Sequence, residues 1–148
     1  GVYIKRSLFL RHKFDEHPDL IGSEDWHCWL RVAAEHEPSL CPGDGALIFD
    51  HETRTMASDP WQQAERRFAY LTADLMASPS TQDYLAPFFN LFRGSQAHYV
   101  AVKAADQSDL SHSITLFARA IRHYPALLGT RRTLYLLRLW LRSILQRS

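Results

Sequence analysis

The feature of this sequence that most constrains its fold is a series of helical patterns after residue 58, separated by proline and glycine. The first follows Asp59-Pro60, a pair typical of a helix start, and it ends before Pro79-Ser80. Its apolar residues recur at helical spacing, at Trp61, Ala64, Phe68, Leu71 and Leu75. This pattern predicts a helix over about residues 60–77.

Three further helical patterns follow, over about residues 81–105, 110–123 and 127–146. In the first of them, Pro87 predicts a kink or late start and Gly94 predicts an interruption. Ser108-Asp109 is a capping pair for the second. Gly129 leaves open whether the last helix begins at 127 or only at Thr130. The sequence therefore predicts a bundle of about four to five helices.

Residues 97–124 have the layout of two helices joined by a short acidic turn. One tetratricopeptide-like unit has the same layout. Such units bury their apolar faces only by stacking, and no second copy occurs at a fixed period. An ordinary αα-hairpin is the preferred interpretation.

The first third of the chain has a different character. Residues 2–10 predict a short strand that turns into a helical turn, and residues 46–50 predict a second strand after a Pro-Gly turn. Between them, residues 24–36 predict a helix with Ser23 as its N-cap and Pro38 beyond its end. The expected fold class is mainly α, with a small α/β piece at the N-terminal end.

Composition excludes several classes of protein. A chain of 148 residues with 46% hydrophobic residues can bury a core, which argues against disorder. Cys28 and Cys41 are too few for a disulfide scaffold and lack the paired spacing of metal ligands. No apolar run is long enough to span a membrane, and the N-terminus lacks the layout of a signal peptide. We therefore expect a cytoplasmic protein.

Charge is distributed unevenly along the chain. From His112 to the end there are seven arginines and no Asp or Glu, whereas the preceding residues carry a net charge of −6. The last helix combines these arginines with leucines, a pattern that suits the inner face of a membrane. Alternatively its apolar stripe packs on the preceding helices. Nucleic acid is not expected as a partner, because no DNA- or RNA-reading motif accompanies the arginines.

Two adjacent carboxylates, Glu24 and Asp25, fall in the first turn of the predicted helix over residues 24–36. Trp26, Trp29 and Leu30 would anchor that turn to a core. Acidic residues in a first turn are often there only because their negative charge interacts favourably with the helix dipole. A carboxylate fixed at the edge of a cleft can also act as a general base.

The motifs around this pair resemble the later half of a family-2, GT-A-type inverting glycosyltransferase. The resemblance rests on a hydrophobic segment ending in Arg, then a Phe-Asp-Glu loop, a Glu-Asp-Trp helix with a Trp-Leu-Arg segment, and a strand leading to a His. In this chain these motifs are Val2 to Arg6, Phe14-Asp15-Glu16, Glu24-Asp25-Trp26, Trp29-Leu30-Arg31 and Leu47 to His51.

The resemblance implies a role for individual residues. Asp25 would be the base that deprotonates the acceptor hydroxyl, and Glu24 would orient the acceptor sugar. His51 matches a position that completes the metal shell or touches the donor diphosphate. The other implied substrate-binding residues are Trp26, Asp15, Glu16 and Arg54. Arg31 is expected to pair with Asp15 or Glu16 and so to hold their loop.

The resemblance also implies what a complete enzyme would contain. Its donor would be a nucleotide sugar, its acceptor a sugar or a lipid-linked sugar, and its cofactor Mg²⁺ or Mn²⁺. This chain has no Asp-x-Asp triplet and no Gly-rich phosphate loop. Residues 1–58 are thus interpreted as the acceptor-side segment and residues 59–148 as a helical extension. We expect such a fragment to be inactive alone and to bind no metal.

A hypothesis from a different class is that the chain is a helical module that binds proteins or membranes. Residues 60–148 would then be the functional part. Trp26 and Trp29 would be core residues rather than sugar-stacking ones. Salt-sensitive binding to lipid vesicles is the observation that favours this second hypothesis.

Overall fold

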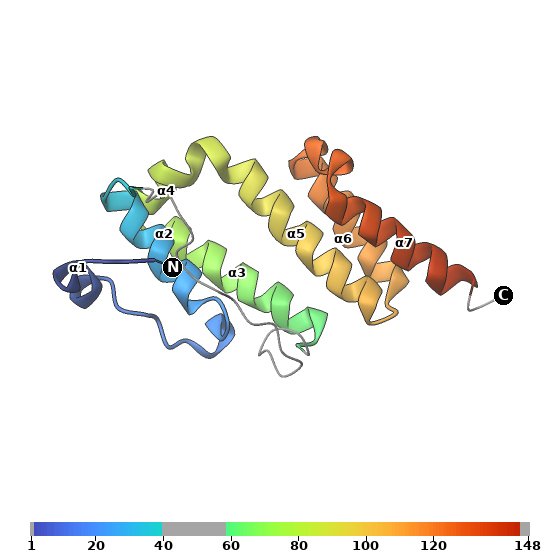
Figure 1. Cartoon of the computed structure of the whole chain (residues 1–148), viewed down its shortest axis with the longest axis horizontal. Helices are drawn as coiled ribbons and strands as arrows, with labels where there is room; N and C mark the ends of the chain where they lie inside the picture. Colours follow the sequence, from blue (N-terminus) through green and yellow to red (C-terminus); the bar gives the residue numbers. More distant parts are fainter. Residues whose placement is uncertain (1, 40–58, 146–148) are drawn as a thin grey trace. The chain divides into compact units, whose positions relative to one another are not determined.

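The computed structural model describes residues 2–39 and 59–145, and these residues are mainly helical (Figure 1). Contacts divide the chain into two compact units, which are described separately below. Unit 1 comprises residues 1–59 and 69–86, and unit 2 comprises residues 60–68 and 87–148. Helix α3 (Trp61–Ala77) contributes its first half to unit 2 and its second half to unit 1.

Unit 1 contains two helices that precede α3 in the chain and one that follows it. α1 (Arg6–Arg11) is followed by a 3₁₀ turn η1 (Pro18–Leu20) and by α2 (Glu24–Glu35), which packs on α4 (Pro79–Leu85). α2 confirms the predicted helix, and Leu20 and Cys28 are among the residues fully buried in this unit. α4 begins two residues before the expected Thr81, because Pro79 occupies its first turn, where a missing N–H costs nothing.

The small α/β piece expected at the N-terminal end is not supported by the structure. Within residues 2–39 there is no strand: residues 2–5 are irregular, and the chain then enters α1. A strand needs a neighbouring strand to bond its backbone groups, and the described residues contain none. The helix satisfies these groups locally, as in the bond that Phe9 N donates to Lys5 O at 3.1 Å. The second expected strand, over residues 46–50, lies outside the described residues.

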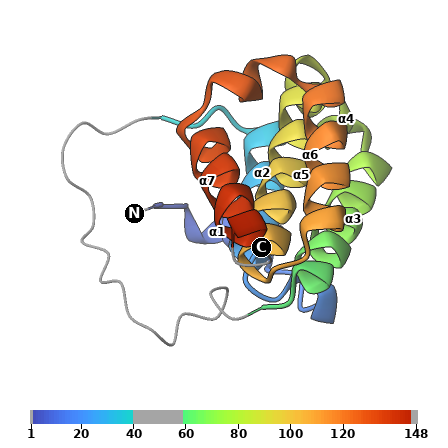
Figure 2. The same cartoon turned by 90° about the vertical axis from the view of Figure 1, so that its right-hand side faces the viewer.

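Unit 2 is built around α5 (Phe89–Asp106), with α6 (Leu110–His123) and α7 (Arg131–Leu145) both packed against it (Figures 1 and 2). α5 and α6 form the expected αα-hairpin, and the side chain of Asp109 caps α6 by accepting from His112 N at 3.3 Å. The 3₁₀ turn η3 (Pro125–Gly129) precedes α7, so the last helix takes the later of its two expected starts.

The core of unit 2 joins these helices to the first half of α3. Small residues of α5, such as Ala101 and Ala104, allow close approach, and Trp61 and Ala64 of α3 belong to the same cluster. A buried hydroxyl links three helices, because Ser113 of α6 donates to Ala101 O and accepts from Trp140 Nε1, each at 2.8 Å. The apolar periodicity of a single helix does not predict this hydrogen-bonded bridge, because its partners come from three helices.

Gly94 does not interrupt α5, contrary to the sequence prediction. The 3₁₀ turn η2 (Ala86–Phe88) around Pro87 separates α4 from α5, and α5 then runs through Gly94 without a break. A Cβ atom at Gly94 would lie 3.0 Å from Tyr124 Cβ and 3.1 Å from Ala120 O. The glycine is therefore a site of close helix approach rather than a helix breaker.

Candidate functional site

The Glu-Asp-Trp motif lies at the start of α2, as the sequence predicts. Ser23 holds the N-cap position, but its side chain makes no capping bond. Instead, a carboxylate oxygen of Asp25 accepts from Trp26 N at 2.7 Å. Asp25 is exposed and Glu24 is half-buried, so both acids of the first turn reach the surface of unit 1.

The two tryptophans of α2 differ in their surroundings. Trp26 is 60% exposed, whereas Trp29 is half-buried and meets Phe14 edge to face, with ring centroids 5.9 Å apart. This contact holds the Phe-Asp-Glu loop against the Glu-Asp-Trp helix. The two sequence motifs thus meet in one compact unit.

Asp15 is held by a residue that the sequence did not indicate. Its carboxylate accepts from Tyr70 OH and from His17 N, each at 2.9 Å, and the ring of His17 stacks on that of Tyr70 at 3.8 Å. Burial acts to raise the pKa of Asp15, but these hydrogen bonds outweigh burial and leave the pKa below its usual value. Among the described residues no ion pair joins Arg31 to Asp15 or Glu16, so the prediction that Arg31 holds this loop is wrong. Glu16 is exposed.

A second long-range pair lies in the same unit. His27, which is fully buried, has Nε2 2.7 Å from a carboxylate oxygen of Asp74 on α3. Neither residue belongs to the motifs of the sequence analysis. His27 and Asp74 are 47 residues apart, and a separation of that size leaves no periodic signal that could have revealed the contact.

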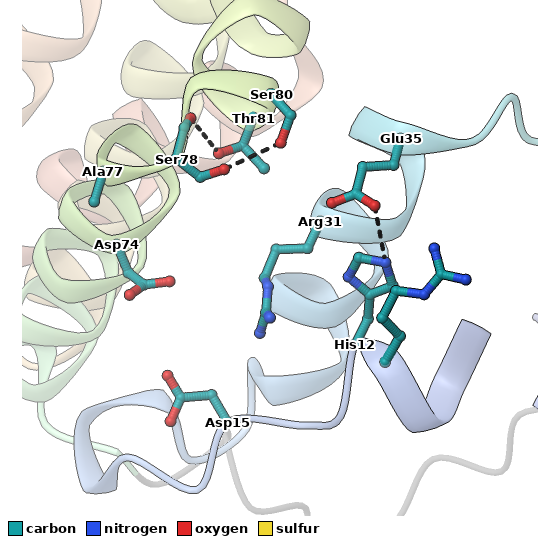
Figure 3. A pocket seen from close by; sticks show the side chains of 10 residues that line it. His12, Asp15, Arg31, Glu35, Asp74, Ala77, Ser78, Ser80 and Thr81 are labelled. Carbon is teal, nitrogen blue, oxygen red and sulfur yellow. Dashed lines mark hydrogen bonds and ion pairs between the residues drawn. The ribbon is translucent and has the colours of Figure 1, made fainter. Parts of the chain in front are cut away.

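A pocket of about 510 Å³ opens beside these residues in unit 1 (Figure 3). Its lining is dominated by charged and hydroxyl side chains: Arg11, His12, Asp15, Arg31, Glu35, Asp74, Ser78, Ser80 and Thr81, with Ala77. In Figure 3, Asp15 and Asp74 lie on one side and His12 and Glu35 on the other. Of the expected substrate-binding residues that the structure describes, only Asp15 lines this pocket.

The remaining predicted site residues fall outside these contacts. Glu24, Asp25 and Trp26 are not among the residues that line the pocket. His51 and Arg54 lie outside the described residues. The structure therefore brings the Phe-Asp-Glu loop together with His27 and Trp29 of α2 and with two residues of α3, but not with Glu24, Asp25 or Trp26.

Two surfaces of α7 differ in what they contact. Leu136 is buried, and Leu139 and Trp140 pack against the core of unit 2. On the opposite side, Leu134, Leu137, Leu141 and Leu145 are 42–75% exposed. We call these four residues the outer face of α7. No helix in the described part of the chain combines the length and apolar character needed to cross a bilayer.

Comparison of the chain with protein-family models, with curated proteins and with solved structures found no match. The resemblance to family-2 glycosyltransferases therefore rests on the motif residues of the sequence alone.

Proposed function

We propose that residues 1–58 are the acceptor-side segment of a family-2, GT-A-type glycosyltransferase that transfers a sugar with inversion, and that residues 59–148 are its helical extension. The observation that carries this proposal is the exposed Asp25 carboxylate in the first turn of α2. The contact between Phe14 and Trp29 joins that turn to the Phe-Asp-Glu loop.

The proposed chemistry needs one base on the acceptor side. Asp25 takes the proton of the acceptor hydroxyl as that oxygen attacks the anomeric carbon, and the nucleoside diphosphate leaves from the opposite face. One carboxylate oxygen of Asp25 accepts from Trp26 N, which limits rotation of the carboxylate. The other oxygen remains available to accept the proton. Glu24 and Trp26 orient the acceptor sugar beside it.

The nucleotide-sugar donor would be bound by parts of the complete enzyme other than this acceptor-side segment. There, Mg²⁺ or Mn²⁺ would neutralise the charge on the departing diphosphate. The resemblance implies donor-side roles for His51 and Arg54, both of which lie outside the described residues. This segment alone is proposed to be inactive.

The pocket in unit 1 suits a saccharide. Carboxylates and guanidinium groups form paired hydrogen bonds with hydroxyl groups, and Ser and Thr hydroxyls can donate or accept. Arg31 lies six residues beyond Asp25, or about 9 Å along the helix axis. An acceptor longer than one sugar ring is therefore proposed, with its reacting hydroxyl at Asp25 and its remaining sugars toward the pocket.

The test replaces Asp25 by Asn in the complete enzyme. Acceptor-dependent release of nucleoside diphosphate is measured with UDP-, GDP- and dTDP-sugars, using free and lipid-linked sugars as acceptors. We expect D25N to lower kcat by about 10²–10⁴-fold, because general-base catalysis contributes that much. D83N, which changes an exposed carboxylate on α4, serves as the matched control. Near-normal turnover in D25N would remove this residue from the role of base.

A second candidate function is favoured by the outer face of α7. We infer that this face binds the anionic inner surface of a membrane, which would keep a cytoplasmic enzyme near lipid-linked acceptors. Arg131, Arg138 and Arg142 are exposed and lie along one edge of the outer face in the helical projection. Each arginine near such a surface adds about 1 kcal/mol of attraction. No acidic residue follows Asp109, so no negative charge in this part of the chain opposes that attraction.

Vesicle sedimentation tests this second function. The chain is expected to bind vesicles that contain anionic lipid, to bind zwitterionic vesicles weakly, and to dissociate as salt rises. L137S/L141S should lose most binding, whereas L10S, which changes an equally exposed leucine of α1, should retain it. Equal binding by both variants would mean that the outer face of α7 is not the contact.

A further inference from the structure

The ends of two helices bring three potential metal ligands together in unit 1. His12 directly follows α1, Glu35 is the last residue of α2, and His36 directly follows α2. One ligand atom from each residue lies within 4.8 Å of the others. This cluster is separate from the acidic pair at the start of α2.

Both histidines carry a buried nitrogen that lacks a hydrogen-bond partner. His12 is 4% exposed, and its Nε2 has only an ion-pair contact with Glu35; the Nε2 of His36 makes no hydrogen bond in the described structure. Buried polar atoms are almost always paired, so the unpartnered Nε2 of His36 beside this ion pair needs an explanation. The backbone of His12 is anchored, because Cys28 Sγ donates to His12 O at 2.8 Å.

One of the ligand–ligand distances fits a tetrahedral metal site, and the other two are within 4.8 Å. His12 Nε2 lies 3.3 Å from a carboxylate oxygen of Glu35. Ligands held at roughly 2.0–2.1 Å from zinc in tetrahedral geometry are separated by about 3.3 Å. A ligand atom of the third residue, His36, lies within 4.8 Å of the other two, so metal binding requires His36 to move closer. We propose that His12, Glu35 and His36 bind a divalent transition-metal ion of the zinc type.

The surroundings of this cluster favour a cation. His12 and Glu35 line the pocket of unit 1, where three carboxylates outnumber two guanidinium groups (Figure 3). The C-terminal end of α2 adds the negative end of the helix dipole. Two imidazoles and one carboxylate leave a fourth position, as in catalytic zinc sites, and here that position is next to the pocket.

A second group of potential ligands, Asp15, His27 and Asp74, is better explained as a hydrogen-bonded network. His27 Nε2 is paired with Asp74, and both oxygens of Asp15 accept hydrogen bonds. His27 Nδ1 is also buried without a hydrogen-bond partner, but the other ligand atoms of this group are already hydrogen-bonded to one another or to neighbouring residues. The His12 cluster differs because His12 and Glu35 line the pocket and no hydrogen bond holds His36 Nε2. The proposal does not depend on glycosyl transfer, since a donor-side Mg²⁺ or Mn²⁺ would prefer oxygen ligands from elsewhere in the enzyme.

The experiment titrates the full chain with Zn²⁺ and, as a spectroscopic probe, with Co²⁺. The wild-type chain is expected to retain one equivalent of Zn²⁺ through gel filtration, to show a tetrahedral Co²⁺ absorption spectrum, and to melt at a higher temperature with Zn²⁺ than without it. E35Q and H36Q test the ligands. E37Q and H123Q are controls of the same residue types.

Losing even an outer-shell partner of a metal lowers affinity by roughly 10–100-fold, so E35Q and H36Q should each weaken Zn²⁺ binding at least about tenfold. Glu35 is exposed, so E35Q should fold normally, and its helical circular dichroism checks this. Failure of the wild-type chain to retain Zn²⁺ overturns the proposal. Equal retention by the wild type, E35Q and H36Q overturns it as well.

Discussion

A buried histidine in α5 makes unit 2 sensitive to acid. His98 is 1% exposed, and its Nε2 lies 3.3 Å from Thr133 Oγ1. Burial and, to a lesser extent, the positive charge of Arg132 together lower the pKa of His98 to about 4. The folded chain therefore holds this ring neutral in a range where an unfolded histidine becomes protonated.

The stability of the chain should fall with acidification because of His98. Since its folded pKa is below the unfolded value, its contribution is present above pH 6.5 and is lost as the pH falls toward 4. The loss between pH 7 and pH 4 is about 3 kcal/mol. Urea unfolding at several pH values should show that H98Q has a shallower pH dependence than the wild type. If the stability of H98Q and of the wild type fell equally with pH, His98 would not be the cause of the acid sensitivity.

At the scale of elements, Gly94 shows how packing overrides propensity. In isolation, glycine destabilises a helix by about 1 kcal/mol relative to alanine. In this chain α5 approaches α6 and η3 at that residue so closely that an added Cβ atom would be 3.0–3.2 Å from its neighbours. The close approach makes glycine the favourable residue despite its lower helix propensity.

Gly94 and Gly129 form a matched pair of substitutions. G94A should destabilise the chain by about 1–3 kcal/mol, because Ala120 O and Tyr124 Cβ have little freedom to retreat. At Gly129 no atom lies within 4 Å of an added Cβ, so G129A should be neutral or stabilising by about 0.4–1 kcal/mol. Denaturant unfolding of both variants gives the comparison. A stabilised G94A would show that the contact relaxes without cost.

Elements with local signals followed the sequence prediction closely. α2, α3 and α6 were expected from apolar period and capping residues, and each is present within a residue or two of its expected bounds. The N-terminal strand failed because strand pairing is not a local property. The packing of α7 remained open in the sequence, and the structure divides it between a buried side and an exposed outer face.

At the scale of the whole molecule, the compact units cut across the proposed boundary at residue 58. The second half of α3 belongs to unit 1, where it supplies Tyr70 to Asp15 and Asp74 to His27. A helix of the proposed extension thus completes the surroundings of the acceptor-side motifs. Removing residues 59–148 would remove the groups that hold this loop in place.

The sequence by itself determined where most helices form, because capping and apolar period act over one or two turns. It also determined that Glu24 and Asp25 fall at a helix start. Only the tertiary structure decided which side chains meet: His12 with Glu35 and His36, Asp15 with Tyr70, and His27 with Asp74. These contacts join residues 23 to 55 positions apart. Hydrogen bonds over such separations depend on how helices pack, and packing leaves no periodic trace in the chain.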